Sequence, residues 1–142
     1  MGAIDGVLIW TEKPTEEDCT IAKCAAKKFF CGRKKKFGFN MQAVVDSKGR
    51  FLDVSIRHPG TTSNYLAFTL NNLLYNQLET PGFLAPGLCL FGDSAYVNTN
   101  YMATSYKNAT GRQDDYNFYH SNVRIKVECA FGMFFHCWGV LR

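Results

Sequence analysis

The sequence predicts a mixed α/β fold in which helices flank a central β-sheet. Three patterns support this prediction: a β-branched and aromatic run near the N-terminus, a hairpin pattern, and two segments with helical spacing of apolar residues. Because strands and helices alternate along the chain, a sheet with helices on its faces buries both kinds of apolar surface. At 142 residues the chain is expected to form one domain, spanning positions 1–142.

Three strands are expected in the first half of the chain. The first runs from residue 4 to about residue 11 and is ended by Pro14. Residues 37–45 and 51–56 are the second and third strands. The sequence Asp-Ser-Lys-Gly at 46–49 lies between them and is a turn signal, so this pair is predicted to form a hairpin.

The second half is expected to contain two helices and one strand. Apolar residues at helical spacing predict a helix over 64–78 and a final helix over 121–140. In the first half, a short helix is also expected within 15–28. The wholly apolar run at 88–91 predicts a strand buried on both faces. Residues 97–117 show no clear period and indicate a long surface segment.

Basic residues are concentrated in one segment, although the net charge is only +4. Seven of the 16 Lys and Arg residues lie between positions 23 and 36, a pattern typical of contact with a phosphate backbone. A solvated basic loop and a nuclear localisation signal at 33–36 are the alternative interpretations, and the latter predicts a nuclear protein. The candidate DNA contacts in this segment are Lys28, Arg33, Lys34, Lys35 and Lys36.

Several classes of protein are excluded by composition. No apolar run reaches the roughly 18 residues of a membrane span, so no membrane partner is expected. The N-terminus lacks the basic and apolar regions of a signal peptide. Because no secretory signal is present, the six cysteines are expected to be reduced thiols in an intracellular protein, and none forms a C-x-x-C pair typical of a zinc site.

Three acidic residues stand in unusual short frames. Asp5 lies in GAIDG before an apolar run, Asp93 follows the apolar run in LCLFGD, and Glu128 lies in VECAFG within the last predicted helix. Carboxylate oxygens are ligands that Mg²⁺ prefers, and a pair of divalent cations suits phosphodiester cleavage. Two carboxylates at strand ends and one on a helix therefore predict a site for Mg²⁺ or Mn²⁺.

The neighbouring residues suit the same chemistry. Gly6 and Gly92 flank their aspartates without side chains, which is expected to leave room for metal and phosphate. Arg124 lies one helical turn before Glu128 and is expected to contact a phosphate or to orient the carboxylate. His120 is a further candidate for a polar contact with DNA.

Each acid also has a purely structural interpretation. Asp5 before a glycine suits the shaping of a turn, and Asp93 before a serine suits the cap of a helix. Glu128 suits an exposed ion pair with Arg124 four residues earlier. The spacing of the residues does not decide between these interpretations and catalysis.

The frames GAIDG, FGFNMQAVVDSKGRFLDVSI, LCLFGDSAY and YNFYHSNVRIKVECAFG, in this order, resemble the DDE endonuclease domain of PIF/Harbinger-type transposases. The resemblance spans about residues 2–142. It implies a ribonuclease-H-like fold and metal-dependent cleavage and transfer of DNA strands. By motif it assigns Asp5, Asp93 and Glu128 as the catalytic and metal-binding triad, and it matches His120 and Arg124 to recurrent residues of unsettled role.

The chain also departs from the family pattern. Similar proteins often carry an Asp where this chain has Asn64, and the resemblance begins and ends so close to the chain termini that truncation at both ends is expected. Family members read DNA through an N-terminal region or a separate partner protein, and an oligomer is left open. The alternatives are a catalytically inactive transposase-derived module that binds DNA or protein, and a ribonuclease for RNA–DNA hybrids.

Overall fold

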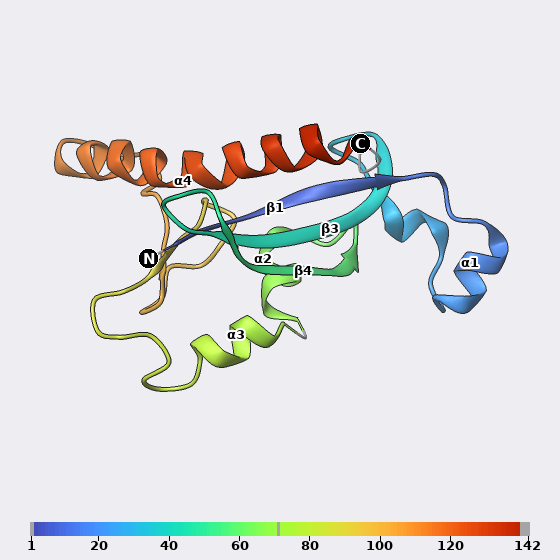
Figure 1. Cartoon of the computed structure of the whole chain (residues 1–142), viewed down its shortest axis with the longest axis horizontal. Coiled ribbons are helices and arrows are strands. Elements are labelled where there is room, and N and C mark those ends of the chain that lie inside the picture. Colours follow the sequence, from blue (N-terminus) through green and yellow to red (C-terminus); the bar gives the residue numbers. More distant parts are fainter. Residues whose placement is uncertain (1, 71, 140–142) are drawn as a thin grey trace.

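The computed structural model describes residues 2–70 and 72–139 and shows an open mixed sheet with helices on both faces (Figure 1). This confirms the predicted mixed α/β class. The elements in chain order are β1 (Gly2–Thr11), α1 (Glu16–Ile21), the 3₁₀ helix η1 (Ala26–Phe29), β2 (Phe30–Cys31), β3 (Lys36–Val45), β4 (Phe51–Pro59), α2 (Asn64–Thr69), α3 (Leu73–Leu78), β5 (Leu90–Phe91), β6 (Met102–Ala103) and α4 (Arg112–Cys137).

The sheet has β3 and β1 at its centre, in the strand order β2-β3-β1-β5-β6, with β4 also paired to β3. Strand β3 is antiparallel to β1, β2 and β4. The pairs β1–β5 and β5–β6 are parallel. The sheet therefore changes from antiparallel to parallel at β1, the strand that carries Asp5.

Two apolar cores lie on opposite faces of the sheet. Residues Ala3 and Ile4 are neighbours in β1 but belong to different cores, as the pleat of a strand requires. Helix α4 covers one face, and helices α2 and α3 lie on the other (Figure 1). The core under α4 includes Met41, Ala43, Val45, Val127, Ala130 and Phe131, and the opposite core includes Val44, Phe68, Leu78, Leu90, Tyr96 and Met102.

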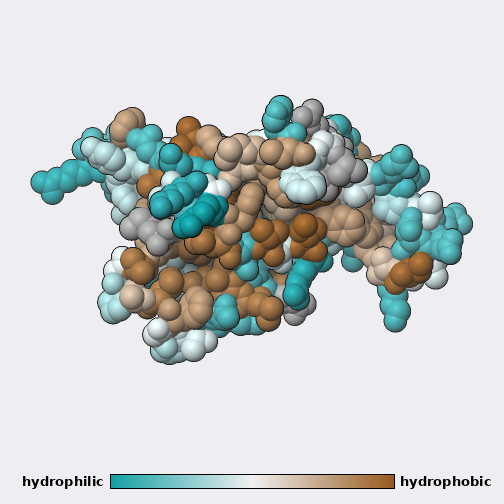
Figure 2. Space-filling view, in the orientation of Figure 1, coloured by the Kyte–Doolittle hydropathy of each residue, from teal (hydrophilic) through white to brown (hydrophobic). Residues whose placement is uncertain are grey.

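The predicted hairpin is confirmed, with strands longer than the sequence indicated. Asp46 accepts hydrogen bonds at Oδ1 from the backbone of Lys48 and Arg50, at 2.8 and 2.9 Å. Gly49 has a φ of +79°, a conformation that glycine adopts without strain. Strand β4 is an edge strand, and its apolar residues Leu52, Val54 and Ile56 stay about half exposed. Hydrophobic surface gathers where Figure 1 places α3 and β4 (Figure 2).

The prediction of one continuous helix over 64–78 is wrong, because the segment forms α2 and α3 with a break between them. Leu70, the residue after α2, has an extended backbone (φ −84°, ψ 116°). Asn72 then starts a new helix by accepting hydrogen bonds from Leu74 N and Tyr75 N at 2.9 and 3.4 Å. The apolar spacing is compatible with both outcomes, so the capping asparagine decides.

The last helix starts at Arg112 rather than at residue 121, while its predicted end at Val140 lies outside the described residues. Asp114 and Asp115 in its first turn suit the positive end of the helix dipole. The surface segment predicted at 97–117 therefore gives its last residues to α4, and it also contains the short strand β6. The strand predicted at 88–91 is shorter and comprises only the two residues of β5.

Two further features concern the cysteines and the length of the apolar helices. All six cysteines are free in this structure. Within residues 2–70 and 72–139, no helix combines the length and the apolar character needed to cross a membrane.

Candidate active site

The candidate site lies where the parallel pairing between β1 and β5 ends. Among the described residues, these strands pair in parallel at two positions, Gly2 with Leu90 and Ala3 with Phe91. Beyond this point β1 continues along β3, whereas the chain after β5 enters a turn. Asp5 and Asp93 each lie two residues after the last pair, at the carboxyl side of the parallel ladder. Crevices at this side of parallel strands are common ligand sites.

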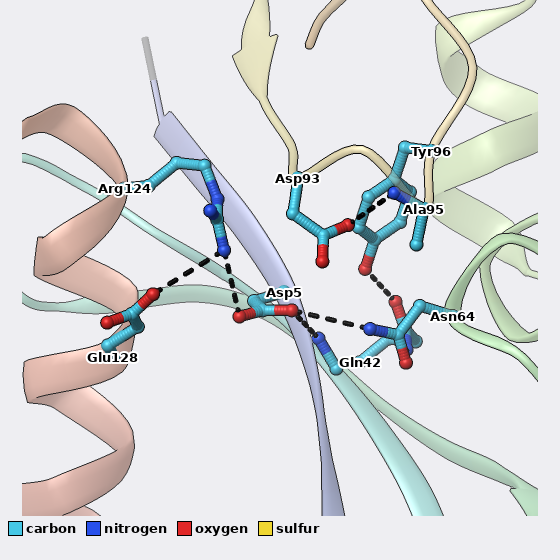
Figure 3. A network of polar contacts seen from close by, with 9 residues as sticks. Asp5, Gln42, Asn64, Asp93, Ala95, Tyr96, Arg124 and Glu128 are labelled. Atoms are coloured by element: carbon cyan, nitrogen blue, oxygen red, sulfur yellow. Dashed lines mark hydrogen bonds and ion pairs between the residues drawn. The ribbon is translucent and has the colours of Figure 1, made fainter. Parts of the chain in front are cut away.

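Helix α4 brings the third acid to the same place. It packs across β1, and its residues Arg124 and Glu128 lie one turn apart on the side facing Asp5 (Figure 3). Asp5, Asp93 and Glu128 all line one cavity of about 690 Å³. The structure thus brings together the three acids that the sequence singled out.

Asp5 is held by contacts on both carboxylate oxygens. Oδ1 accepts hydrogen bonds from Gly6 N at 2.7 Å and from Asn64 Nδ2 at 3.4 Å. Oδ2 accepts from Arg124 Nη2 at 3.2 Å. Burial raises the pKa of Asp5 above its usual value. The Gly6 amide and Arg124 offset this shift in part, and the carboxylates of Asp93 and Glu128 add to it. The three acids are therefore close enough to influence one another electrostatically.

Arg124 neutralises part of this negative charge. Its Nη2 atom lies 3.2 Å from Asp5 Oδ2 and 3.5 Å from Glu128 Oε1. The Arg124 side chain is only 17% exposed, and its Nε is buried without a hydrogen-bond partner among the described residues. The structural interpretation of Glu128 as an ion-pair partner of Arg124 is thus confirmed, and Asp5 shares the same guanidinium.

Asp93 belongs to a turn rather than to a helix. Its Oδ1 accepts a hydrogen bond from Ala95 N at 2.9 Å, and its carbonyl oxygen accepts one from Tyr96 N at 3.1 Å. No helix starts at Ser94, so the interpretation of Asp93 as a helix cap is wrong. The hydrogen bond to Ala95 fixes the side chain, which extends toward the space beside Asp5 (Figure 3).

The donor chemistry of the cavity fits a divalent cation, although the ligands are not gathered into a finished cluster. Carboxylate oxygens are hard ligands of the kind that Mg²⁺ prefers. Within the described ranges, however, no group of three or more His, Cys, Asp or Glu side chains already has the arrangement of a metal site. Arg124 pairs with both Asp5 and Glu128, so its guanidinium competes with a cation for these two carboxylates.

The two glycines next to the aspartates do not leave space for a metal or a phosphate, contrary to expectation. A Cβ atom on Gly6 would lie 2.2 Å from both Asn64 Oδ1 and Gln42 Nε2. A Cβ atom on Gly92 would lie 2.9 Å from Met102 Sδ and from the Tyr96 ring. Each glycine therefore allows protein side chains to pack closely against the backbone beside an aspartate.

The basic segment reaches the cavity through part of its length. Arg33 and Lys34 line the cavity together with the three acids. The Lys36 Nζ lies 3.1 Å from the centre of the Trp10 ring. In this cation–π contact the ammonium group already has a partner within the protein. Three of the DNA contacts predicted in this segment lie outside the cavity lining, namely Lys28, Lys35 and Lys36.

His120 is a packing residue, and the prediction that it contacts DNA is wrong. Its side chain is only 2% exposed, so it offers no surface to a nucleic acid. Its Nε2 lies 3.1 Å from the carbonyl oxygen of Ala103, and its ring packs against Phe91 and Tyr116. His120 therefore holds the first half of α4 against β5 and β6.

Sequence reasoning missed a buried polar network next to Asp5 that contains Asn40, Gln42 and Tyr96. All three are at most 8% exposed, and Tyr96 and Gln42 both appear in the close view of the site (Figure 3). A signal was present in the sequence. Asn40 and Gln42 are polar residues at alternating positions of an otherwise apolar strand, which places both on one face.

Comparison with known proteins identifies the family. No curated protein and no solved structure gives a significant match to the chain. The family model described as DDE superfamily endonuclease matches residues 4–142, a range that contains all three acids of the cavity. The chain therefore belongs to the DDE superfamily endonuclease family.

Proposed function

We propose that this chain is the metal-dependent DNA endonuclease domain of a PIF/Harbinger-type transposase, built on a ribonuclease-H-like sheet. The observation that carries the proposal is one cavity that is lined by Asp5, Asp93 and Glu128 and also by the basic residues Arg33 and Lys34. The family supplies the reaction class, because DDE superfamily endonucleases cleave nucleic acid.

In this proposal Asp5, Asp93 and Glu128 hold the divalent cations. When bound, Mg²⁺ or Mn²⁺ supplies Lewis acidity and neutralises the charge that develops on the phosphate. Asp5 and Asp93 are fixed by the sheet and by the turn after β5, through hydrogen bonds to Gly6 N and Ala95 N. Glu128 is more exposed, at 58% of its side chain, and completes the site from α4.

The basic residues of the cavity hold the DNA. Arg33 and Lys34 are exposed and stand on the cavity wall, where they neutralise phosphates of the backbone. Arg124 pairs with Asp5 and Glu128 in this structure, and with cations on those carboxylates it would be available to donate hydrogen bonds to a phosphate of the DNA. The acids thus hold positive charge, and the basic residues on the wall hold the substrate.

Nicking of supercoiled DNA tests the assigned roles. In the presence of Mg²⁺ or Mn²⁺ the unmodified chain is expected to convert supercoiled plasmid to the open circular form. Asp93→Ala and Glu128→Ala should abolish nicking while the circular dichroism spectrum and melting temperature stay close to those of the parent. Matched controls are Asp53→Asn on the edge strand and Glu17→Gln on α1, both of which should nick normally. Retained nicking in either alanine variant contradicts the assignment.

An inactive module that binds DNA or protein is the second candidate, and the position of Arg124 favours it. A guanidinium that already bridges Asp5 and Glu128 replaces part of the charge that a cation would supply. Calorimetric titration with Mn²⁺ separates the candidates. Binding heat that is lost in Asp5→Asn supports the nuclease, and absence of such heat in the parent supports the inactive module.

The proposal also covers partners and location. Recognition of transposon ends is assigned to a separate DNA-binding partner or to protein segments outside this domain, and the basic stretch at 33–36 serves nuclear import. Fusion of residues 23–36 to a fluorescent reporter tests the second assignment. Accumulation of the reporter in nuclei is expected, and a uniform distribution contradicts import by this segment.

A further inference from the structure

We propose that Tyr96, Gln42, Asn40 and Asn64 form a positioning relay that fixes the orientation of the Asp5 carboxylate. The inference rests on the proposed role of Asp5 as a cation ligand and extends it to residues of β3, α2 and the turn after β5. Figure 3 shows Tyr96, Gln42 and Asn64 close to Asp5, and Asn64 donates to one oxygen atom of the Asp5 carboxylate.

The relay is a continuous series of side-chain hydrogen bonds. The Tyr96 hydroxyl donates to Gln42 Oε1 at 2.5 Å, and Gln42 Nε2 donates to Asn40 Oδ1 at 2.7 Å. Asn40 Nδ2 then donates to Asn64 Oδ1 at 3.1 Å, and Gln42 Nε2 reaches the same oxygen at 3.4 Å. Asn64 Nδ2 donates to Asp5 Oδ1 at 3.4 Å and ends the series.

The relay has a single polarity. The Tyr96 hydroxyl is the donor at the start, because the amide oxygen Gln42 Oε1 can only accept a hydrogen bond. Because Gln42 accepts this hydrogen bond at Oε1, its Nε2 faces Asn40. The same reasoning fixes Asn40, whose Nδ2 also donates to the Thr62 carbonyl at 2.9 Å. Asn64 consequently accepts on Oδ1 and presents its donor nitrogen to Asp5.

Because the relay residues are buried, reversing the direction of their hydrogen bonds would cost free energy. Gln42 is 2% exposed and Tyr96 is 5% exposed, so water cannot replace a lost partner at either residue. Reversing one side-chain amide of the relay would therefore leave a buried polar atom without a hydrogen bond. The chain also makes room for the relay, since a Cβ atom at position 6 would displace the side-chain ends of Asn64 and Gln42. The glycine that follows Asp5 thus serves the same purpose as the four relay residues.

The two carboxylate oxygens of Asp5 consequently have different contacts. Oδ1 is held from the strand side by Gly6 N and Asn64 Nδ2. Oδ2 is left pointing toward α4, where Arg124 now occupies it. A cation that replaces the guanidinium meets an oxygen whose direction is already set, so little rotational freedom is lost on binding.

Three variants separate positioning from structural support. Tyr96→Phe removes only the first donor and keeps the ring that packs edge-on against Phe68. Asn64→Ala removes the last donor. Tyr75→Phe is the matched control, because this tyrosine packs against the same Phe68 ring and lies outside the relay. Each variant is first melted without metal, and all binding is measured well below its melting temperature.

Two readouts are used, the ¹⁵N resonances of the side-chain amides in metal-free protein and the affinity for Mn²⁺ measured by calorimetry. Tyr96→Phe is expected to shift the Asn64 side-chain amide, although no hydrogen bond joins the two residues directly, and to weaken Mn²⁺ binding. Asn64→Ala is expected to weaken Mn²⁺ binding by about 10-fold, the usual effect of losing a residue that orients a metal ligand. Tyr75→Phe should change neither quantity.

The outcomes are distinguishable. An unchanged Asn64 amide in Tyr96→Phe overturns the relay, and so does an unchanged Mn²⁺ affinity in Asn64→Ala when the parent chain binds the ion. If the parent binds no Mn²⁺ at all, the proposed function fails, and the amide resonances alone then decide whether the relay exists. If Asn64→Ala fails to fold, both readouts on Tyr96→Phe decide the question.

Discussion

Asp5 is the residue at which stability and proposed function oppose each other. Its side chain is only 17% exposed, and burial raises its pKa, so the folded chain favours the protonated form more than the unfolded chain does. A cation ligand must nevertheless be ionised. The ionised carboxylate therefore costs folding free energy near neutral pH, and active sites commonly carry such costs.

Replacing Asp5 with the isosteric asparagine should therefore stabilise the fold near pH 7. Below the usual Asp pKa both states are protonated and the gain disappears, whereas above the raised folded-state pKa the gain is complete. Urea unfolding of parent and Asp5→Asn between pH 3 and pH 7 measures this difference. Asp46→Asn is the control of opposite sign, because hydrogen bonds from Arg50 hold the pKa of Asp46 below its usual value. A constant difference for Asp5→Asn across the pH range would contradict the interpretation.

Arg124 is expected to act as an internal substitute for the cation. Arg124→Gln leaves the carboxylates of Asp5 and Glu128 without their shared guanidinium, so the metal-free protein should lose about 2 kcal/mol of stability. Removing the competitor should also make the rise in melting temperature on addition of Mn²⁺ larger than in the parent. Arg50→Gln, which breaks the exposed pair with Asp46, is the control and should leave the Mn²⁺ effect unchanged. A smaller Mn²⁺ effect in Arg124→Gln contradicts this role.

At the scale of elements, the sequence predicted what local patterns determine. The hairpin of β3 and β4 follows from the turn residues at 46–49 and from two flanking apolar runs, and it is present. The helix predicted over 64–78 failed because apolar spacing continues through the break, while a single side chain, Asn72, caps a new helix. Boundaries set by one capping residue are harder to predict than the elements themselves.

The cap formed by Asn72 should be worth about 1 kcal/mol of folding free energy. Its side chain is 3% exposed and accepts hydrogen bonds from Leu74 N and Tyr75 N, so Asn72→Ala leaves both donors without that partner. Chemical unfolding measures the loss. Asn76→Ala, at an exposed position inside α3, is the matched control and should be neutral or slightly stabilising, because alanine favours helix more than asparagine does. Equal losses in the two variants would contradict the capping role.

At the scale of the whole molecule, the site depends on contacts between distant parts of the chain. The sequence singled out Asp5, Asp93 and Glu128, and the structure places all three on one cavity, while their catalytic role stays a prediction. The relay to Asp5 was not predicted, because it requires the pairing of Gly6 with Gln42 and the approach of α2 to β3. Neither the register nor the approach leaves a local pattern in the sequence.

The charge of the molecule is also arranged at this scale. The cavity wall combines three acids with Arg33 and Lys34, while other basic residues of the same segment lie outside it. Position relative to the cavity, rather than the net charge of +4, should therefore decide which basic residues bind DNA. Residues on the wall are expected to contact phosphates directly, and those elsewhere are expected to contribute little.

Salt dependence of DNA binding tests this division. Each phosphate contact adds about 0.9 to the slope of log K against log salt concentration, so Arg33→Ala with Lys34→Ala should reduce the slope by about 2. Lys23→Ala with Lys27→Ala removes the same charge from outside the cavity and should leave the slope nearly unchanged. Fluorescence anisotropy with a short labelled duplex, without divalent metal, measures both slopes. Equal reductions in the two double variants would mean that DNA binding follows the total charge of the segment. That result would contradict the hypothesis that DNA binds along the cavity.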